Sequence, residues 1–307
     1  MPHSFHYGGQ AVIEGVMMRG ERITATVVRH PNGQLVTQTR PLSSLYTGGM
    51  RKTPLVRGVT MLMETMVLGI RSLLFSANVA LEEDGEEEPS KISGGLIWGV
   101  MAVSLVLSVG LFFMAPLFLA NLLNPYVESS LLFHLVEGLI RLVIFVAYLR
   151  IISSFSDIKR TFAYHGAEHK TINAIENGAP LKVTSIRKYS TAHTRCGTSF
   201  LLAVLVIAII IFALVGQQAL WLMILTRIVL LPVIAALGYE ATRYSANHPD
   251  NLLVRILRSP GLWLQRMTTK EPDDSQLEVA ITALEKVMAF DRAVEEDQAA
   301  RSAAVSS

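Results

Sequence analysis

The sequence predicts a mainly α integral membrane protein. We expect a bundle of four transmembrane helices, one interfacial or re-entrant amphipathic helix, a small N-terminal β-hairpin region and a cytoplasmic C-terminal helix. Hydrophobic residues make up 51% of the chain, and they are concentrated rather than evenly spread. Stretches without Asp, Glu, Lys or Arg lie between Lys91 and Glu128 and from Cys196 to Thr226. Both exceed the roughly 18 apolar residues that cross the hydrocarbon core of a bilayer.

Net charge and cysteine content exclude two features, nucleic-acid binding driven by charge and a framework of disulfides. The formal net charge is +2 over 307 residues, which does not indicate nucleic acid. The single cysteine, Cys196, excludes an intrachain disulfide framework. Met1–Tyr7 is short and polar, unlike a cleaved signal peptide, so the first apolar segments are expected to direct insertion. The expected partners are the lipid bilayer and proteins that bind the cytoplasmic regions.

The first 50 residues are expected to be soluble and rich in β-structure. Apolar and polar residues alternate over 23–27, which is typical of a half-buried strand. Pro31–Gly33 is a hairpin turn signal, and Gln34–Arg40 forms the returning strand. Before this hairpin, the glycines of Gly8–Gly20 permit tight turns or close backbone contacts. Because an isolated hairpin is only marginally stable in water, we expect this region to pack on the cytoplasmic loop.

A helix rich in Leu, Val and Met is expected over residues 55–81. Arg57, Glu64 and Arg71 recur every seven residues and therefore lie on one face. A narrow polar stripe on an apolar helix suits an interfacial or re-entrant segment. The alternative is a helix packed against the bundle. The acidic run Glu82–Glu88 that follows reads as a solvated linker.

Four membrane spans are expected after the acidic run. Charges inside a membrane are costly, so they should face the bundle rather than lipid. Glu137 and Arg141 are spaced to pair along their own helix, a structural role. Arg227 is expected to snorkel or to pair across helices. The spans lie within Gly94–Leu123 and at Leu131–Ile152, Thr198–Val215 and Ala219–Tyr239.

The distribution of Lys and Arg predicts the orientation. The segment between the second and third spans carries seven of them, whereas Asn124–Ser130 and the turn at Gly216 carry none. Basic loops stay inside, so both termini are expected in the cytoplasm. In the tail, Leu277, Ile281, Leu284 and Met288 line one side of a charged helix. The predicted regions are a β-rich head (1–50), the amphipathic helix and linker (51–93), a membrane domain (94–245) with a cytoplasmic loop (155–196), and a cytoplasmic tail (246–307).

The cytoplasmic loop contains the pattern H-x-x-E-H, from His165 to His169. On a helix this spacing places both imidazoles on one face, as bidentate metal ligation requires. Glu168 could then act as general base beside a metal-bound water, in the order found in inverzincin metalloproteases. Imidazole ligands favour a divalent transition metal, most simply zinc. The alternative is that the two histidines cap or bridge helices.

Two sets of residues could complete the site. Glu240, at the cytoplasmic end of the fourth span, would give His₂Glu with an open position, which is typical of catalytic zinc. His193 and Cys196, before the third span, would give a closed His₃Cys site, which is typical of structural zinc. Glu240 could instead form an ion pair with Arg243 or Arg227. Cys196 could instead be a small packing residue.

Long motifs of the chain resemble those of the YqhQ family of bacterial membrane proteins. The resemblance extends from about Gly8 to Met288 and implies a multi-pass protein of the bacterial plasma membrane. Members of this family, a domain of unknown function, are often described as metal-dependent enzymes, so the resemblance implies no particular substrate. The motifs that carry it are Gly8–Gly20, Tyr164–Lys170, His193–Phe200, Pro260–Gln265, Thr268–Pro272 and Glu278–Ile281.

Two classes of function remain open from the sequence. The first is a metal-dependent membrane enzyme, most simply a hydrolase acting on a lipid or peptide at the cytoplasmic face. The second is a non-enzymatic scaffold or regulator whose cytoplasmic loop is held by a structural metal. An open site favours the first class and a closed site favours the second. Transport is less well supported, because the chain has no visible inverted repeat.

Overall fold

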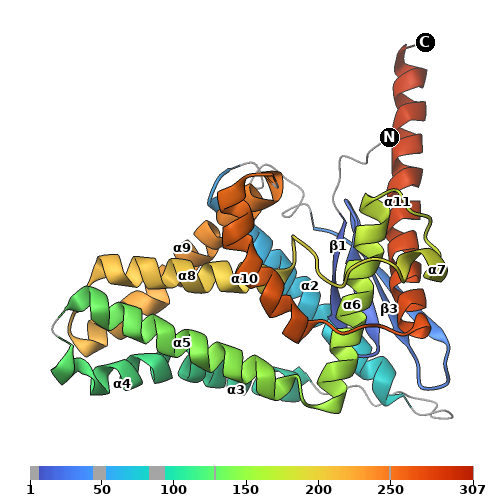
Figure 1. Cartoon of the computed structure of the whole chain (residues 1–307). Coiled ribbons are helices and arrows are strands. Elements are labelled where there is room, and N and C mark those ends of the chain that lie inside the picture. Colours follow the sequence, from blue (N-terminus) through green and yellow to red (C-terminus); the bar gives the residue numbers. More distant parts are fainter. Residues whose placement is uncertain (1–6, 44–52, 83–93, 128, 249, 307) are drawn as a thin grey trace.

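A bundle of long helices and a small helix-covered β-sheet lie at opposite ends of the computed structural model (Figure 1). The structure describes residues 7–43, 53–82, 94–127, 129–248 and 250–306. The predicted fold class, mainly α with an N-terminal β-region and a C-terminal helix, is confirmed. Apart from Glu82, the predicted acidic linker Glu82–Glu88 lies outside the described residues.

The N-terminal residues form a four-stranded antiparallel sheet in sequence order. The predicted hairpin is confirmed, and its turn contains Gly33 with φ of 89°. The glycine-rich segment forms a second hairpin, in which Glu14 adopts φ of 51° at the turn. The strands are β1 (Gly8–Val12), β2 (Gly15–Arg19), β3 (Ile23–Arg29) and β4 (Leu35–Pro41).

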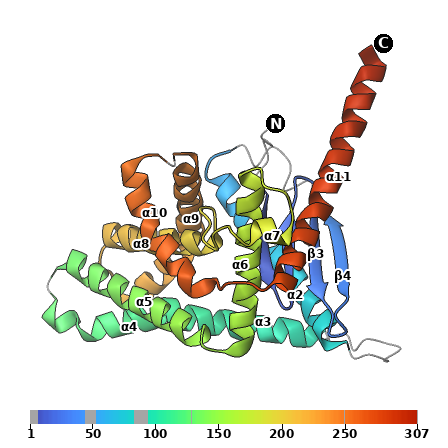
Figure 2. The same cartoon turned by 45° about the vertical axis from the view of Figure 1, so that its right-hand side comes forward.

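Helices cover both faces of the sheet. On one face, α6 (Ser156–Glu176) and α11 (Asp274–Ser306) bury alternate strand residues such as Val16 in the main core. On the other face, α2 (Val56–Leu81) packs through Val79 against Val28 and Val12. The predicted packing of the N-terminal region on the loop 155–196 is thereby confirmed, since β1 lies on α6. Figure 2 shows that the end of α11 projects beyond the sheet.

The predicted apolar face of the tail helix is confirmed. Its four residues are all buried against the sheet and α6, because their spacing keeps them on one side of α11. They are Leu277, Ile281, Leu284 and Met288.

Four helices of the described chain are long and apolar enough to cross a membrane. Three of them agree with predicted spans. They are α3 to α4 (Gly94–Val109 and Ala115–Leu122, joined by the π-helical turn η2 at Gly110–Met114), α8 (Gly197–Val215) and α9 (Leu220–Asn247). The fourth by these criteria is α2, rather than the predicted span now seen as α5 (Ser130–Ile152).

The contacts of α2 distinguish it from the other apolar helices. Near its start, Gly58 lies against Ala236 of α9. Further along, Ser72 hydrogen-bonds Thr26 of the sheet over 3.0 Å. A helix that packs one side against a β-sheet is not surrounded by lipid. These contacts favour an interfacial position between the sheet and the bundle, in agreement with the amphipathic helix expected from the sequence.

The helix α5 lies among the apolar helices, packed on α4 and α8. Its 23 residues give a length of about 35 Å, enough to cross the core of a bilayer. Its ionisable side chains His134, Glu137 and Arg141 are all buried. Because these side chains are buried within the protein, their charges do not face lipid.

A cluster of ionic side chains lies inside the bundle. Glu137 accepts a hydrogen bond of 2.6 Å from Arg141, so the predicted pair along the helix is confirmed. Arg227 of α9 donates to the same carboxylate over 2.5 Å, which confirms pairing across helices rather than snorkelling. Arg141 also donates to the main-chain carbonyl of Phe112, within the π-helical turn. Every charge of this trio therefore has a partner in the bundle.

Candidate metal centre

The H-x-x-E-H motif lies on α6, as the spacing predicts. The rings of His165 and His169 lie one turn apart and are tilted by 60° to one another, with their centroids separated by 4.3 Å. His169 is buried and His165 is half-buried. The helix alone therefore brings two imidazoles together at one place.

Main-chain carbonyls orient both imidazoles in the same way. Nδ1 of His165 lies 2.8 Å from the carbonyl oxygen of Thr268. Nδ1 of His169 lies 2.5 Å from that of Thr191. Because a carbonyl oxygen accepts and does not donate, each Nδ1 carries a proton, so in the neutral form of each imidazole the lone pair is on Nε2. In metal-binding histidines, the ring nitrogen that does not bind the metal usually donates a hydrogen bond of this kind, which fixes the orientation of the ring.

Cys196 brings a thiol to the two histidines. Its Sγ lies 3.4 Å from Nε2 of His165, and it caps the N-terminus of α8 by accepting from the amide of Thr198. The partial positive charge of a helix N-terminus favours a negatively charged ligand there. Ligand atoms of His165, His169 and Cys196 all lie within 4.8 Å of one another, a set that could hold a metal ion.

Two further predicted site residues border this trio. Oε2 of Glu168 lies 3.5 Å from Nε2 of His169, and Glu168 is 4% exposed. The ring of His193 is centred 5.5 Å from that of His169, with its Nε2 3.5 Å from Glu176. Burial lowers the pKa of His193, against the opposing charge of Glu168, so its imidazole is neutral at neutral pH. His193 is thus outside the tight trio but next to it.

Glu240 does not join the cluster. Its carboxylate accepts hydrogen bonds from the Arg57 guanidinium and from the amide of Leu55, at the start of α2. Arg57 replaces the predicted partners Arg243 and Arg227, because the packing of α2 on α9 brings it to this carboxylate. The compact group of potential ligands found in the described residues contains Cys196 instead of Glu240. The His₂Glu arrangement is therefore not supported by the geometry.

Two glycines allow the surrounding segments to approach the site. A side chain at Gly166 would collide with the carbonyl oxygen of Lys270, in the segment that presents the Thr268 carbonyl to His165. A Cβ at Gly9, in β1, would lie 2.9 Å from Cγ of Glu168. Gly166 and Gly9 therefore both allow the main chain to pack closely around the candidate metal centre.

Residues outside the predicted set hold the loop before α8. Asn173 donates to the carbonyls of Ser190 and Ala192, on either side of the carbonyl that orients His169. Gln265 of α10 (Leu252–Thr268) accepts from the His193 amide and donates to its carbonyl, both over 2.9 Å. Sequence reasoning missed these roles, because an amide that binds backbone leaves no pattern of its own.

These elements define the class: a helical membrane protein with a histidine and cysteine cluster beside its apolar helices. The chain belongs to the family described as "Protein of unknown function (DUF1385)", whose family model matches residues 53–290. It is 33% identical over 306 residues to "Uncharacterized protein YqhQ" of Bacillus subtilis (strain 168), covering 95% of each chain. The resemblance to the YqhQ family is thereby confirmed. No solved structure matches.

Proposed function

We propose that this protein is a metal-dependent membrane enzyme, most simply a hydrolase, with one divalent transition-metal ion held by His165, His169 and Cys196. The observation that carries the proposal is the shared orientation of the two imidazoles. Both Nδ1 atoms are committed to main-chain carbonyls, so both Nε2 lone pairs are available beside the Cys196 sulfur. Two nitrogens and one sulfur suit zinc.

Three protein ligands leave one position for water or substrate, as in catalytic zinc sites. When bound, the metal would supply a Lewis acid and lower the pKa of a bound water to about 7. Glu168 supplies the general base, since its buried carboxylate lies 3.5 Å from Nε2 of His169. β1 lies against Glu168 at Gly9, and the burial of Glu168 limits the access of bulk water to its carboxylate.

The second candidate function is that of a scaffold with a structural metal. The position of His193 favours it, because its neutral ring lies 5.5 Å from His169 and a side-chain rotation could make it a fourth ligand. His₃Cys coordination would close the site and exclude water. The metal would then hold the loop before α8 to α6, and the sheet and tail would recruit partners.

Metal analysis of the purified full chain tests both candidates. We expect about one zinc ion per chain, lost in His169→Ala and in Cys196→Ser. His248→Ala is the matched control, because His248 is exposed and its ring hydrogen-bonds the Tyr244 carbonyl and stacks on the Tyr244 ring, away from the candidate centre. Wild-type protein that contains no stoichiometric transition metal after gentle purification contradicts both candidates.

Glu168→Gln separates the enzyme from the scaffold. In the enzyme, this variant keeps its zinc and its fold but loses hydrolysis of lipids or peptides, measured by mass spectrometry on proteoliposomes made from bacterial lipid extract. In the scaffold, the variant behaves as wild type and His193→Ala releases the metal. Retained hydrolysis in Glu168→Gln contradicts its role as base.

The bilayer is the expected surrounding of the apolar helices, and we propose the bacterial plasma membrane with both termini in the cytoplasm. The Lys and Arg distribution supports this orientation. In a Cys196→Ser background, a membrane-impermeant thiol reagent applied to intact cells should label a cysteine at Gln218 and spare one at Lys182. Labelling at Lys182 in sealed cells contradicts the orientation.

A further inference from the structure

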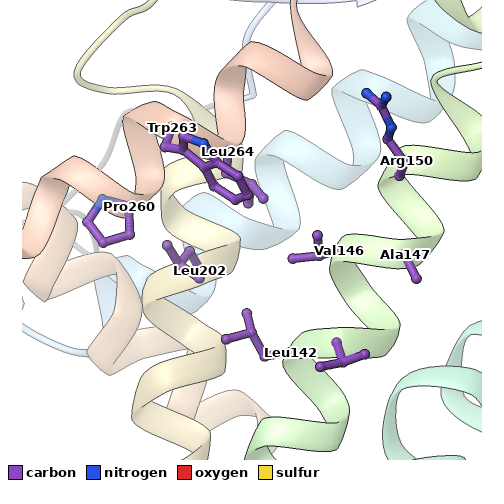
Figure 3. A pocket seen from close by; sticks show the side chains of 9 residues that line it. Leu142, Val146, Ala147, Arg150, Leu202, Pro260, Trp263 and Leu264 are labelled. Atoms are coloured by element: carbon purple, nitrogen blue, oxygen red, sulfur yellow. The ribbon is translucent and has the colours of Figure 1, made fainter.

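An apolar groove lies between α5, α8 and α10, on the outside of the bundle. Figure 3 shows it bordered by Leu142 and Val146 of α5, Leu202 of α8, and Trp263 of α10. Its volume is about 580 Å³, within the range of roughly 300–1,000 Å³ that is usual for ligand sites. Two of the three helices that form it, α5 and α8, belong to the apolar bundle, so we expect the groove to face acyl chains rather than water.

Arg150 places a positive charge at one end of the groove. It lies in the last turn of α5, and it is exposed. In the described part of the chain, no acidic side chain forms an ion pair with it. Figure 3 shows its side chain pointing away from Leu142, which lies towards the other end. The groove is therefore apolar along its length and cationic at one end.

The helix α10 has the character of a membrane-surface helix. Its exposed apolar side chains include Leu253, Ile256, Leu257 and Trp263, whereas Arg255 and Arg266 interrupt the apolar sequence. An amphipathic helix of this kind lies in the headgroup region with its apolar face towards the acyl chains. Trp263 fits this depth, because tryptophan is enriched at the membrane–water interface. Arg150, which lines the same groove as Trp263 from the last turn of α5, is therefore expected at the level of the headgroups.

The groove and the candidate metal centre share α10. Leu264 lines the groove, the next residue Gln265 holds His193, and Thr268 presents its carbonyl to His165. Leu264 and Thr268 are one turn apart, about 6 Å along the helix axis. The groove wall at Leu264 is therefore one helical turn from the residue whose carbonyl orients His165.

We infer that this groove binds one acyl chain of an anionic phospholipid, whose phosphate pairs with Arg150. Apolar walls select the hydrocarbon chain, and the unpaired guanidinium selects a negatively charged headgroup over a zwitterionic one. The site presents an anionic lipid to the metal centre as the class of substrate. This last step rests on the proposed function, whereas the binding site itself does not.

Fluorescence quenching by brominated lipids tests the site in the full-length protein. The chain has three tryptophans, and replacing Trp98 and Trp221 by Phe leaves Trp263 as the reporter. Reconstituted protein is titrated with phosphatidylglycerol or phosphatidylcholine carrying brominated chains. We expect half-quenching at about fivefold lower mole fraction of phosphatidylglycerol, the selectivity that one basic residue confers near anionic lipid.

Variants at the groove identify the source of that selectivity. Arg150→Gln should abolish the fivefold difference and Arg150→Lys should retain it. Arg255→Gln is the matched control, an exposed arginine outside the groove lining, and should keep the full difference. Ala147→Phe, which fills the groove, should weaken quenching by both lipids. Equal quenching by the two lipids in the parent protein, or an unchanged difference in Arg150→Gln, overturns the proposal.

Zinc content, measured on the same preparations, separates this inference from the proposed function. Zinc bound at wild-type level without headgroup selectivity overturns the lipid site and leaves the metal centre standing. Headgroup selectivity in protein that binds no metal supports the lipid site and removes its role in presenting a substrate.

Discussion

The buried ionic cluster within the bundle and the histidine and cysteine cluster beside it differ in how their polar atoms are satisfied. Within the bundle, the Glu137 carboxylate accepts hydrogen bonds from two guanidinium groups. At the candidate metal centre, the outer nitrogens of two imidazoles are held by carbonyls while the inner ones face a thiol. In the first arrangement, each charged group has a partner of opposite charge within the bundle. The second leaves lone pairs that converge on one point.

The difference shows that burial of ionisable groups does not by itself indicate a site. Opposite charges that saturate one another hold helices in register, and we assign the trio of Glu137, Arg141 and Arg227 to that structural role. Imidazole Nε2 atoms and a thiolate sulfur are all electron-pair donors, and a metal ion can bind them together. His165, His169 and Cys196 are such a set.

The largest expected effect comes from breaking the ionic cluster of Glu137, Arg141 and Arg227. Glu137→Ala leaves two buried arginines without their carboxylate, and we expect a loss of about 3–5 kcal/mol in the free energy of unfolding. Unfolding by sodium dodecyl sulfate in mixed micelles measures it. Glu285→Ala, an exposed residue of α11, is the control and should change stability by less than about 0.5 kcal/mol. A Glu137→Ala protein as stable as wild type shows that the cluster does not hold the bundle.

Metal removal should reduce the stability of the region around His165, His169 and Cys196 and leave the ionic cluster of the bundle unchanged. With free zinc at 100 times its dissociation constant, the bound metal stabilises the folded state by about 2.7 kcal/mol, which a chelator should remove. Hydrogen exchange before and after chelation measures the effect by segment. We expect faster exchange in α6 and in the loop before α8, with unchanged exchange around Glu137 in α5. Identical exchange in both segments with and without chelator contradicts the contrast between the clusters.

Gly166→Ala tests whether packing orients the metal ligands. The added Cβ collides with the Lys270 carbonyl and displaces the segment that holds His165. We expect a stability loss of about 1–3 kcal/mol and a loss of roughly 10–100-fold in zinc affinity, measured by competition with a chelating dye.

The matched control for this prediction is Gly197→Ala, beside Cys196, where an added Cβ meets nothing within 4 Å. Zinc affinity in this control should stay at the wild-type value. Equal affinities in the two variants mean that the position of the Thr268 carbonyl does not matter for the metal.

The smallest effect is expected at the loop that holds His169. Asn173→Ala removes two hydrogen bonds to the carbonyls around Thr191, and we expect a cost of about 1 kcal/mol. The zinc dissociation rate should rise, because the Thr191 carbonyl then moves more freely. Asn177→Ala is the control, since Asn177 bonds only its own helix in the described structure. A dissociation rate equal to that of the control shows that the loop is held by other contacts.

The predicted elements that proved correct share a local cause. The hairpin around Gly33, the apolar face of α11 and the pairing of imidazoles on α6 each follow from residues that are close together in the sequence. The placement of α2 could not be decided from composition, because an apolar helix can face lipid or a sheet. The hydrogen bond between Ser72 of α2 and Thr26 of β3 shows that α2 packs against the sheet.

The sequence by itself determined the membrane character, the N-terminal hairpin and the two histidines, because runs of apolar residues and fixed helical spacing act over short distances. The tertiary structure alone decided that Cys196 joins these histidines while Glu240 binds Arg57. It also decided which carbonyls orient the rings, since that of Thr268 comes from 103 residues away in the chain. Every residue carries a carbonyl, so no sequence pattern marks the one that packing brings to a histidine.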